Sequence, residues 1–325
     1  MQKEKKRADR NRTLTLSDAE RKQLAGLLLT PEAELSAEQL ADRIICGDFT
    51  AMLDFLPDKF VDLLILDPPY NLQKNFNGLC FNSMSHQSYS DYLESWFPKL
   101  LRLLKPGASV YLCGDWLCSA AGFMVLDKYL TVRNRIVWQR EKGRGAKSNW
   151  KNCCEDIWFA TAGKNYTFNV DQVKQKRRVL APYRSSNGTP RDWVDTDEGK
   201  FRLTCPSNFW DDISVPYWSM PENTDHPTQK PEKLMAKLIL ASSNPGDMVF
   251  DPFSGSGTTA VTAKKLGRRF LGIELNKEYC LWALARLKMA ETNTRIQGYE
   301  DGVFWERNAL KSKSSTQAPS RRSSQ

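Results

Sequence analysis

The chain alternates between two kinds of apolar pattern over much of its length. Continuous apolar runs at residues 61–66 and 108–113 have the length of strands that are buried on both faces of a parallel sheet. Other segments, such as residues 89–104, have apolar residues at the spacing of an amphipathic helix. Strands that alternate with helices predict an α/β protein with a doubly wound sheet.

The same patterns predict where the elements begin and end. Residues 17–43 are expected to be helical with a break near Pro31, and Ser36 with Gln39 is expected to form a capping box. The polar stretch at residues 71–90 is too long for an ordinary connection, so we interpret it as a candidate mobile lid. Further helices are predicted at 49–56, 89–104, 116–130, 232–242, 258–266 and 277–290, and strands at 43–48, 61–66, 108–113, 133–139, 155–161, 248–251 and 269–274.

Residues 141–225 interrupt this alternation, because periodicity is lost over much of the segment and Pro, Gly, Ser, Trp and charged residues dominate. Basic residues interleaved with aromatic ones suit a nucleic-acid surface. A solvated loop with incidental charge is the plainer alternative. The basic residues are Lys174, Lys176, Arg177, Arg178 and Arg184, and the aromatic ones are Tyr166, Phe168 and Tyr183.

Charge and composition narrow the possible partners. The formal net charge of +9 and the pI of about 9.1 favour a polyanion, although a basic protein without such a partner is the alternative. No apolar run approaches the roughly 20 residues that span a bilayer, and the N-terminus lacks the apolar core of a signal peptide, so we expect a cytoplasmic chain. The 8 scattered cysteines suit reduced thiols, and with only 2 histidines no metal site is expected.

A glycine-rich loop follows the predicted strand at 248–251, in the segment Asp251-Pro252-Phe253-Ser254-Gly255-Ser256-Gly257. A dinucleotide fingerprint would need a third glycine, which argues against a nicotinamide oxidoreductase. Asp251 would repel a pyrophosphate but suits a cationic ligand such as the sulfonium and ammonium of S-adenosylmethionine. Glu274 ends the next strand, where an acid can accept both ribose hydroxyls; an acid near a helix N-terminus is the alternative.

A second loop, Asp67-Pro68-Pro69-Tyr70, ends the predicted strand at 61–66, and ligands bind at such carboxyl ends. The prolines remove two backbone donors, which leaves the Asp67 carboxylate and the Pro68 carbonyl as acceptors. Two acceptors that hold both hydrogens of an exocyclic amine would aim its nitrogen at a methyl donor and stabilise the developing positive charge. Tyr70 offers a face for stacking a base that has left the duplex. A plain Pro-Pro turn is the alternative.

These two loops together resemble the S-adenosylmethionine-dependent amino DNA methyltransferases. The catalytic motif precedes the cofactor loop here, an order that resembles the β class, and the segment His226-Pro227-Thr228-Gln229-Lys230-Pro231 strengthens the likeness. The resemblance covers residues 43–161 and 226–290, and it leaves residues 1–42 and the long stretch after Tyr70 unmatched. It implies a mostly parallel, circularly permuted, Rossmann-like methyltransferase sheet with an inserted target-recognition region.

The resemblance also implies roles for single residues. Asp67 and Pro68 would grip the target amine, Pro69 would complete the catalytic loop, and Tyr70 would stack the base. Asp48 and Phe49 would lie near the cofactor adenine, and Glu274 would bind the ribose. The methionine end would be held by Thr228, Gln229 and Lys230, and the cofactor loop would comprise Asp251, Phe253, Gly255, Ser256, Gly257 and Thr258.

The implied division of the chain is a basic arm and helical extension at 1–42, a catalytic half at 43–140, and the last core strand with the target-recognition region at 141–225. A cofactor-binding half follows at 226–300, and then a tail at 301–325 that is expected to be disordered from about 311.

The resemblance implies methylation of double-stranded DNA by a bacterial or phage enzyme, either an orphan or one that works beside a restriction endonuclease, and by analogy a homodimer. Asp67 favours transfer to N6 of a flipped adenine. Two alternatives stay open: N4-cytosine transfer on the same fold, and a catalytically silent DNA-binding subunit.

Overall fold

The computed structural model describes residues 8–76, 79–140, 148–179, 183–196 and 199–306, and a large sheet lies at its centre. The first five strands in spatial order, from β1 (Arg43–Cys46) at one edge to β5 (Leu104–Gly114), run parallel to one another. The next strand, β7 (Cys154–Thr161), runs antiparallel to both of its neighbours. Of the residues described, eight strands form the sheet, in the order β1 (Arg43–Cys46), β13 (Arg269–Glu274), β12 (Met248–Asp251), β2 (Val61–Leu66), β5 (Leu104–Gly114), β7 (Cys154–Thr161), β6 (Thr131–Gln139) and β11 (Phe209–Trp210).

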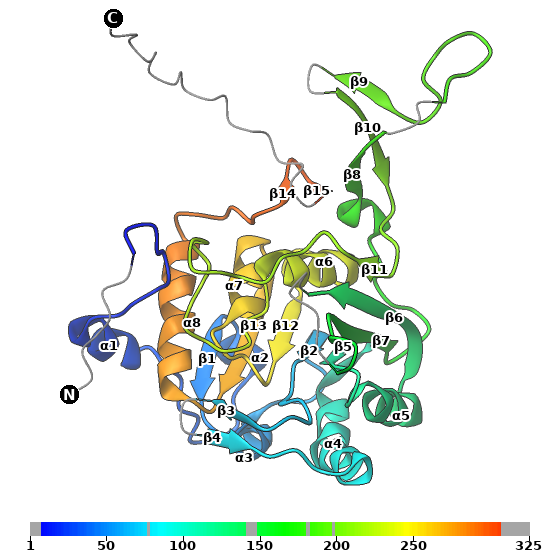
Figure 1. Ribbon diagram of the computed structural model, residues 1–325. Helices are drawn as coiled ribbons and strands as arrows, with labels where there is room; N and C mark the ends of the chain where they lie inside the picture. Colours follow the sequence, from blue (N-terminus) through cyan, green and yellow to red (C-terminus); the bar gives the residue numbers. More distant parts are fainter. Residues whose placement is uncertain (1–7, 77–78, 141–147, 180–182, 197–198, 307–325) are drawn as a thin grey trace, which may run out of the picture.

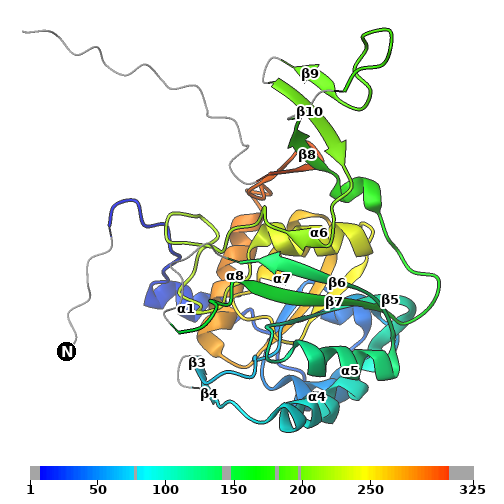
Figure 2. The same ribbon diagram turned by 45° about the vertical axis from the view of Figure 1, so that its right-hand side comes forward.

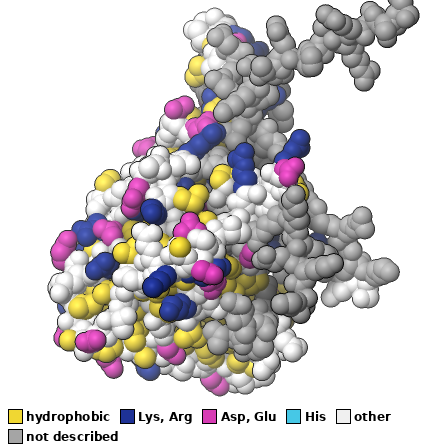
Figure 3. Space-filling view, turned by 90° about the vertical axis from the view of Figure 1, so that its left-hand side faces the viewer, with side chains coloured by type: hydrophobic (Ala, Val, Ile, Leu, Met, Phe, Trp, Pro, Cys, Tyr) yellow, Lys and Arg dark blue, Asp and Glu magenta, His cyan; other side chains and the backbone are white. Residues whose placement is uncertain are grey.

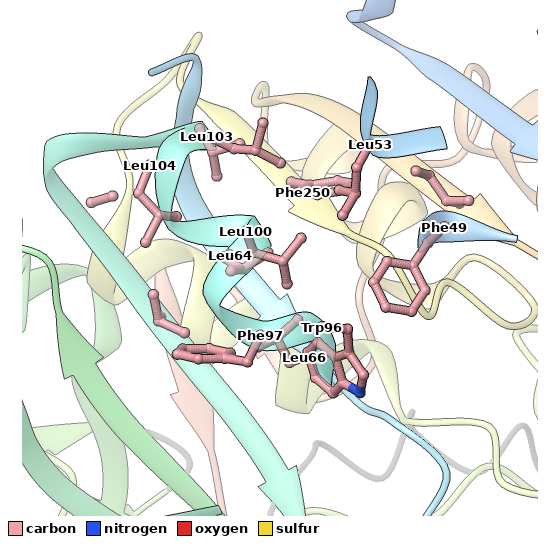
Figure 4. Packing of buried hydrophobic residues seen from close by; sticks show 14 of the residues in the cluster. Phe49, Leu53, Leu64, Leu66, Trp96, Phe97, Leu100, Leu103, Leu104 and Phe250 are labelled. Carbon is pink, nitrogen blue, oxygen red and sulfur yellow. The ribbon is translucent and has the colours of Figure 1, made fainter. Parts of the chain in front are cut away.

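Helices cover both faces of the sheet, so the predicted doubly wound α/β fold is confirmed (Figure 1). One layer packs Trp96, Phe97 and Leu100 against the strand residues Leu64 and Leu66, as Figure 4 shows. That layer contains α3 (Phe49–Met52), α4 (His86–Leu100) and α5 (Ser119–Tyr129), and the opposite layer contains α6 (Glu232–Ser242), α7 (Thr258–Lys265) and α8 (Lys277–Ala290).

The strand order brings the two sequence motifs together. β12 and β2 are hydrogen-bonded neighbours, with Val249 opposite Leu63, although 186 positions separate these residues in the chain. From this pair the spatial order of the strands extends outward in both directions, through β13 and β1 on one side and through β5 on the other. Ligands bind beside the carboxyl ends of strands at such a switch point. The loops after β2 and β12 both begin there.

The N-terminal extension is less helical than predicted, although the predicted break near Pro31 and the short helix after Ser36 are both confirmed. It contains α1 (Asp18–Ala25) and α2 (Ala37–Leu40), with non-helical residues between them. Each helix begins with a capping box, and the predicted box of Ser36 and Gln39 is confirmed. α1 ends at Ala25 with Gly26 as its C-cap, before Pro31 is reached, since glycine weakens a helix.

The segment at 71–90, which the sequence marks as a candidate mobile lid, is not one long irregular loop. It contains β3 (Lys74–Phe76) and β4 (Leu79–Phe81), which pair antiparallel, and α4 already begins at His86. Buried Asn71 fastens the segment, because its side chain donates to the Met84 carbonyl at 2.8 Å and accepts from the Met84 N–H at 2.7 Å. α4 ends at Leu100 and a 3-10 turn follows at Leu101–Leu103, so Lys105, Pro106 and Gly107 belong to β5 instead of stopping the helix.

A second sheet projects from the first, as Figures 1 and 2 show. Its strands are too short and too polar for the sequence pattern to predict, and β15 joins it from a distant part of the chain by pairing parallel with β8. Residues 307–325, including the predicted disorder from 311, lie outside the described residues, as do residues 1–7 of the predicted arm. The order of the sheet is β14 (Tyr299–Glu300), β15 (Val303–Trp305), β8 (Gln175–Arg178), β10 (Gly199–Thr204) and β9 (Val194–Thr196).

No helix in the described part of the chain combines the length and the apolar character that crossing a membrane requires.

Candidate active site

A cavity of about 540 Å³ opens where the two motif loops meet. The loop after β1 and the segment at 226–231 complete its walls, together with the side chains that β7 and α4 present. Of the predicted site residues, the lining contains Asp48, Phe49, Asp67, Pro68, Pro69, Tyr70, Thr228, Lys230, Phe253, Gly255 and Glu274. The structure therefore gathers most of the predicted catalytic and cofactor residues around one space.

The Asp67 carboxylate is the most densely contacted group of the catalytic loop. The Lys230 ammonium donates to both of its oxygens, at 2.8 and 2.7 Å, and the Tyr70 hydroxyl donates to Oδ1 at 3.0 Å. Burial raises the pKa of Asp67, and the Lys230 ammonium opposes that rise without cancelling it. The loop itself is held by the Tyr89 hydroxyl, which donates to the Pro69 carbonyl at 3.1 Å.

A second buried carboxylate, Glu155 at the start of β7, faces the same cavity and was not among the predicted site residues. It accepts from Arg140 at 2.8 Å, and the Lys230 ammonium lies 3.3 Å away. The Tyr70 hydroxyl lies 2.9 Å from Glu155 Oε2, so its single hydrogen can go to either Asp67 or Glu155. Burial alone would raise the pKa of Glu155, but the cations Lys230 and Arg140 outweigh burial and hold it below its usual value. Glu155 therefore stays ionised.

The glycine loop closes the cavity on the cofactor side. The Gly255 N–H donates to Glu274 Oε2 at 2.8 Å, and the Asn276 N–H donates to Oε1 at 2.7 Å, which fixes the Glu274 carboxylate at the rim. Gly255 has a φ of +53°, and a Cβ there would lie 3.0 Å from His226 Nε2. An alanine there would therefore be strained by the left-handed backbone and would crowd the His226 ring.

Asp251 occupies a different place from the one expected of a ligand-facing acid. It is buried, lies outside the cavity lining, and accepts from the Thr259 hydroxyl at 2.6 Å and the Phe253 N–H at 2.9 Å. Burial raises its pKa to about 7. Asp251 thus braces the loop from beneath.

Three other predicted loop residues, Ser256, Gly257 and Thr258, also lie behind the lining. The buried Arg286 holds two of them, because it donates to the Ser256 carbonyl at 2.8 Å and to the Thr258 hydroxyl at 3.0 Å.

An aromatic wall separates the cavity from the core. The rings of Phe49 and Phe253 meet edge to face with centroids 4.8 Å apart, and Trp96 packs against both (Figure 4 shows Phe49 and Trp96). Asp48 caps α3 by accepting from the Thr50 N–H at 2.8 Å and also lines the cavity. A flat ring system such as adenine fits against such a wall.

Some side chains of the segment at 226–231 line the cavity, and others point into the protein interior. Thr228 lines the cavity, whereas the Gln229 amide lies outside the lining, where its oxygen accepts from Thr224 and its nitrogen donates to the Glu222 carbonyl. Lys230, expected near a methionine carboxylate, instead lies between Asp67 and Glu155. A buried ammonium needs such counter-charges, and these two carboxylates raise the pKa of Lys230 despite its burial.

The predicted DNA-binding residues belong to the second sheet and its loops, away from the cavity lining. Several already have partners: Lys174 pairs with Asp171 at 2.7 Å and Arg177 with Glu306 at 3.5 Å. The remaining three contact aromatic rings: Lys176 lies 4.1 Å from the Trp305 centroid, Arg178 5.9 Å from Phe201 and Arg184 5.0 Å from Trp193. On the face in Figure 3, basic and acidic side chains are interspersed instead of forming a patch of one sign.

Within the described residues, no three His, Cys, Asp or Glu side chains gather as a metal site would need. The cysteines that the structure describes are free thiols, and burial raises the pKa of Cys113 and Cys118.

The fold and the cavity together define an α/β protein of the methyltransferase type, with a glycine loop and an acidic Pro-Pro loop at one switch point. The chain belongs to a family of DNA methylases, because the family model N6_N4_Mtase, described as "DNA methylase", matches residues 61–285. This confirms the family that the two loops indicate in the sequence. The protein is a methyltransferase that acts on DNA.

Curated relatives agree with this assignment. The DNA adenine methyltransferase YhdJ of Escherichia coli (strain K12) is 38% identical over 257 residues, which cover 77% of this chain and 84% of the relative. The type II methyltransferase M.HpaI of Haemophilus parainfluenzae is 34% identical, with 75% and 74% covered. The type II methyltransferase M1.MboII of Moraxella bovis is 33% identical, with 76% and 96% covered.

Solved structures share the fold. The PvuII DNA methyltransferase, described as cytosine-N4-specific, aligns with a TM-score of 0.56 at 18% identity over 78% of this chain and 92% of its own. TTHA0409 of Thermus thermophilus, a putative DNA modification methylase complexed with S-adenosyl-L-methionine, aligns with a TM-score of 0.52 at 21% identity, with 82% and 98% covered. The Rossmann-like methyltransferase fold predicted from the sequence is thereby confirmed.

Proposed function

We propose that the protein transfers a methyl group from S-adenosylmethionine to N6 of an adenine flipped out of double-stranded DNA. The observation that carries this proposal is the single cavity that Asp67 shares with the glycine loop and Glu274. A methyl donor on one side and an amine on the other would meet there without a carrier. Direct transfer needs such closeness, since reacting atoms must approach to about 3–3.5 Å.

The cofactor half of the cavity suits an adenosyl group. Glu274 lies at the end of β13 with its carboxylate fixed by two backbone N–H groups, and its remaining lone pairs can accept from ribose hydroxyls. Phe49 and Phe253 offer aromatic faces and edges to an adenine, and Asp48 is a nearby acceptor. Family membership and the S-adenosyl-L-methionine complex of TTHA0409 support the same cofactor.

The catalytic half suits an amine that gains positive charge. Asp67 would accept an amino hydrogen and stabilise the charge that moves from the sulfonium to the nitrogen, which is electrostatic stabilisation by preformed acceptors. The methylated nitrogen is strongly acidic and can lose its proton to Asp67 or to water. Tyr70 would stack on the flipped base, and its hydroxyl is fixed by two carboxylates, which restrains the ring.

Adenine is favoured over cytosine by Asp67 at the first position of the catalytic loop. The name of the 38% identical relative, a DNA adenine methyltransferase, points the same way. The fold is no guide, since a cytosine-N4-specific enzyme shares it.

The decisive experiment incubates the protein with labelled S-adenosylmethionine and unmethylated genomic DNA, digests the DNA to nucleosides and identifies the product by mass spectrometry. N6-methyladenine in the wild type and none with Asp67→Ala is the expected result. N4-methylcytosine alone would reject the adenine assignment. Cofactor binding without transfer to any DNA would reject catalysis and favour a silent DNA-binding subunit.

The wider role is also a proposal. M.HpaI and M1.MboII are named type II methyltransferases, which supports a bacterial, cytoplasmic enzyme that acts beside a cognate restriction endonuclease. Long-read sequencing of DNA from a methylation-free host that expresses the chain would reveal the target sequence. Sedimentation of the purified protein, alone and with a target duplex, would test for a homodimer.

A further inference from the structure

We propose that Glu155 is a positioning residue for methyl transfer, which draws the Lys230 ammonium and the Tyr70 hydroxyl away from Asp67 when the target amine arrives. This inference rests on the proposed function. It concerns a residue that neither loop motif contains.

The two donors lie between two carboxylates. The Tyr70 hydroxyl lies 3.0 Å from Asp67 Oδ1 and 2.9 Å from Glu155 Oε2, so it can donate to either one. The Lys230 ammonium lies 2.7 Å from Asp67 and 3.3 Å from Glu155. A small displacement of the Tyr70 hydroxyl and the Lys230 ammonium would therefore transfer their hydrogen bonds from Asp67 to Glu155, and neither donor would be left without an acceptor.

Asp67 needs such an exchange to accept the substrate. An ionised carboxylate offers about four lone-pair sites, and in this structure Lys230 contacts both oxygens of Asp67 while Tyr70 contacts one. An incoming amino hydrogen must compete with these donors. If Glu155 takes up the hydroxyl and part of the ammonium, lone pairs of the Asp67 carboxylate become available to the amine.

The charge balance of the cluster points to the same role. Asp67 and Glu155 are the anions of the cluster, Lys230 and Arg140 are its cations, and their formal charges cancel. Without the Glu155 charge, the cluster would carry one excess positive charge beside a nitrogen that is becoming positive. Like charges in a cavity of low dielectric repel strongly, so transfer would be slowed even where binding is intact.

The fold explains why Glu155 reaches the site. β7 is the strand that runs against its neighbours, so its first residues lie at the edge where β5 ends, as the pairing of Asp156 with Gly114 shows. Successive residues of a strand point to opposite faces. Glu155 therefore faces the cavity, whereas Asp156 pairs with Arg135 at 2.9 Å outside the cavity lining.

Asp156 provides a matched control, because it is an equally buried acid, paired with an arginine, on the same strand. We expect Glu155→Gln to lower kcat at saturating DNA by about 100-fold, the scale of a misplaced catalytic group, while the Kd for S-adenosylmethionine changes less than threefold. Asp156→Asn should leave kcat within about threefold of wild type. Glu155→Asp keeps the charge but shortens the side chain by one methylene, so its kcat should lie about tenfold above that of Glu155→Gln and about tenfold below wild type.

A pH profile separates positioning from a loss of structure. The Glu155 charge raises the pKa of Asp67, so its removal should move the acid limb of the kcat profile to lower pH while the plateau falls. A change confined to folding would lower the amount of active enzyme and leave the limb in place.

The outcomes are distinct. Equal turnover of Glu155→Gln and Asp156→Asn, with an active wild type, would overturn the role of Glu155 and leave the proposed function standing. If Glu155→Gln does not fold, Glu155→Asp decides: a kcat about tenfold below that of Asp156→Asn supports the inference, and equal values overturn it. A wild type that methylates no DNA would overturn the proposed function and this role with it.

Discussion

Replacing Gly257 with alanine tests whether the glycine loop requires glycine for space or only for backbone conformation. Gly257 has a φ of +77°, and a Cβ at this position would lie 2.5 Å from the Cβ of Ala283 and 2.9 Å from its Cα. Ala283 belongs to α8, so the added methyl group would press the loop and α7 away from that helix.

Two costs add in the Gly257→Ala variant. A left-handed backbone costs a non-glycine residue about 1–2 kcal/mol. Separation of packed helices to admit a methyl group costs about 1–3 kcal/mol more. The expected loss of unfolding free energy is therefore about 2–5 kcal/mol. The displaced loop should also weaken binding of S-adenosylmethionine by about tenfold or more, since the Gly255 to Glu274 contact is part of the same turn.

Gly267 offers a matched control, because its φ is +73° but no described heavy atom lies within 4 Å of its missing Cβ. Gly267→Ala should lose only the backbone term, about 1–2 kcal/mol, and keep cofactor affinity. Urea unfolding measures the first quantity and calorimetric titration the second. If the two variants lose the same unfolding free energy, the contact with Ala283 is not what demands glycine, and the steric argument fails.

Three further predictions concern other parts of the molecule. Burial beside Glu232 raises the pKa of Glu222 to about 7. Between pH 4.5 and pH 7 the folded state therefore holds a proton that the unfolded state releases, and stability falls as the pH rises. In urea unfolding, the unfolding free energy that Glu222→Gln gains over wild type should be about 1–3 kcal/mol larger at pH 8 than at pH 5, and an equal gain would refute the assignment. Trp150 has 95% of its surface exposed and should stack on a base or sugar of the DNA. Trp150→Ala should therefore weaken DNA binding about tenfold in fluorescence anisotropy. Leu27, another exposed apolar residue, is the control, and Leu27→Ala should leave DNA binding unchanged. The last prediction neutralises four basic residues of the second sheet together: Lys174, Lys176, Arg177 and Arg178. The slope of the logarithm of the DNA association constant against the logarithm of salt concentration should fall in magnitude by about 3–4. An unchanged slope would place these residues off the DNA path.

The central sheet was predictable because its strands are buried on both faces and so carry continuous apolar runs. The strand at 61–66 and the strand at 248–251 begin and end where the pattern predicts, and so do the helices at 232–242 and 277–290. Burial on both sides leaves few polar positions in these strands that would blur the pattern.

The second sheet escaped prediction for the opposite reason. β8 contains Gln175, Lys176, Arg177 and Arg178, which read as a charged loop, and β9 and β15 have three residues each. Such strands are stabilised by partners that are distant in sequence, here Phe304 opposite Gln175. Pairing of this kind is a tertiary property, which a local pattern does not contain.

The candidate site was predictable motif by motif, but its electrostatics were not. Lys230 was predicted to face the methionine carboxylate of the cofactor, yet its counter-charges come from Asp67, 163 positions away, and from Glu155. A weaker signal was present: two consecutive acids open an otherwise apolar strand at residues 155–161.

Because adjacent strand residues point to opposite faces of the sheet, one of these two acids had to lie on the face that the cavity borders and the other on the opposite face. Choosing between them needs the register of β7 against β5, and that register depends on a strand reversal that the alternation of strands and helices does not reveal. Glu155 therefore enters the chemistry only once the direction of β7 is known, and the comparison of Glu155→Gln with Asp156→Asn tests that step directly.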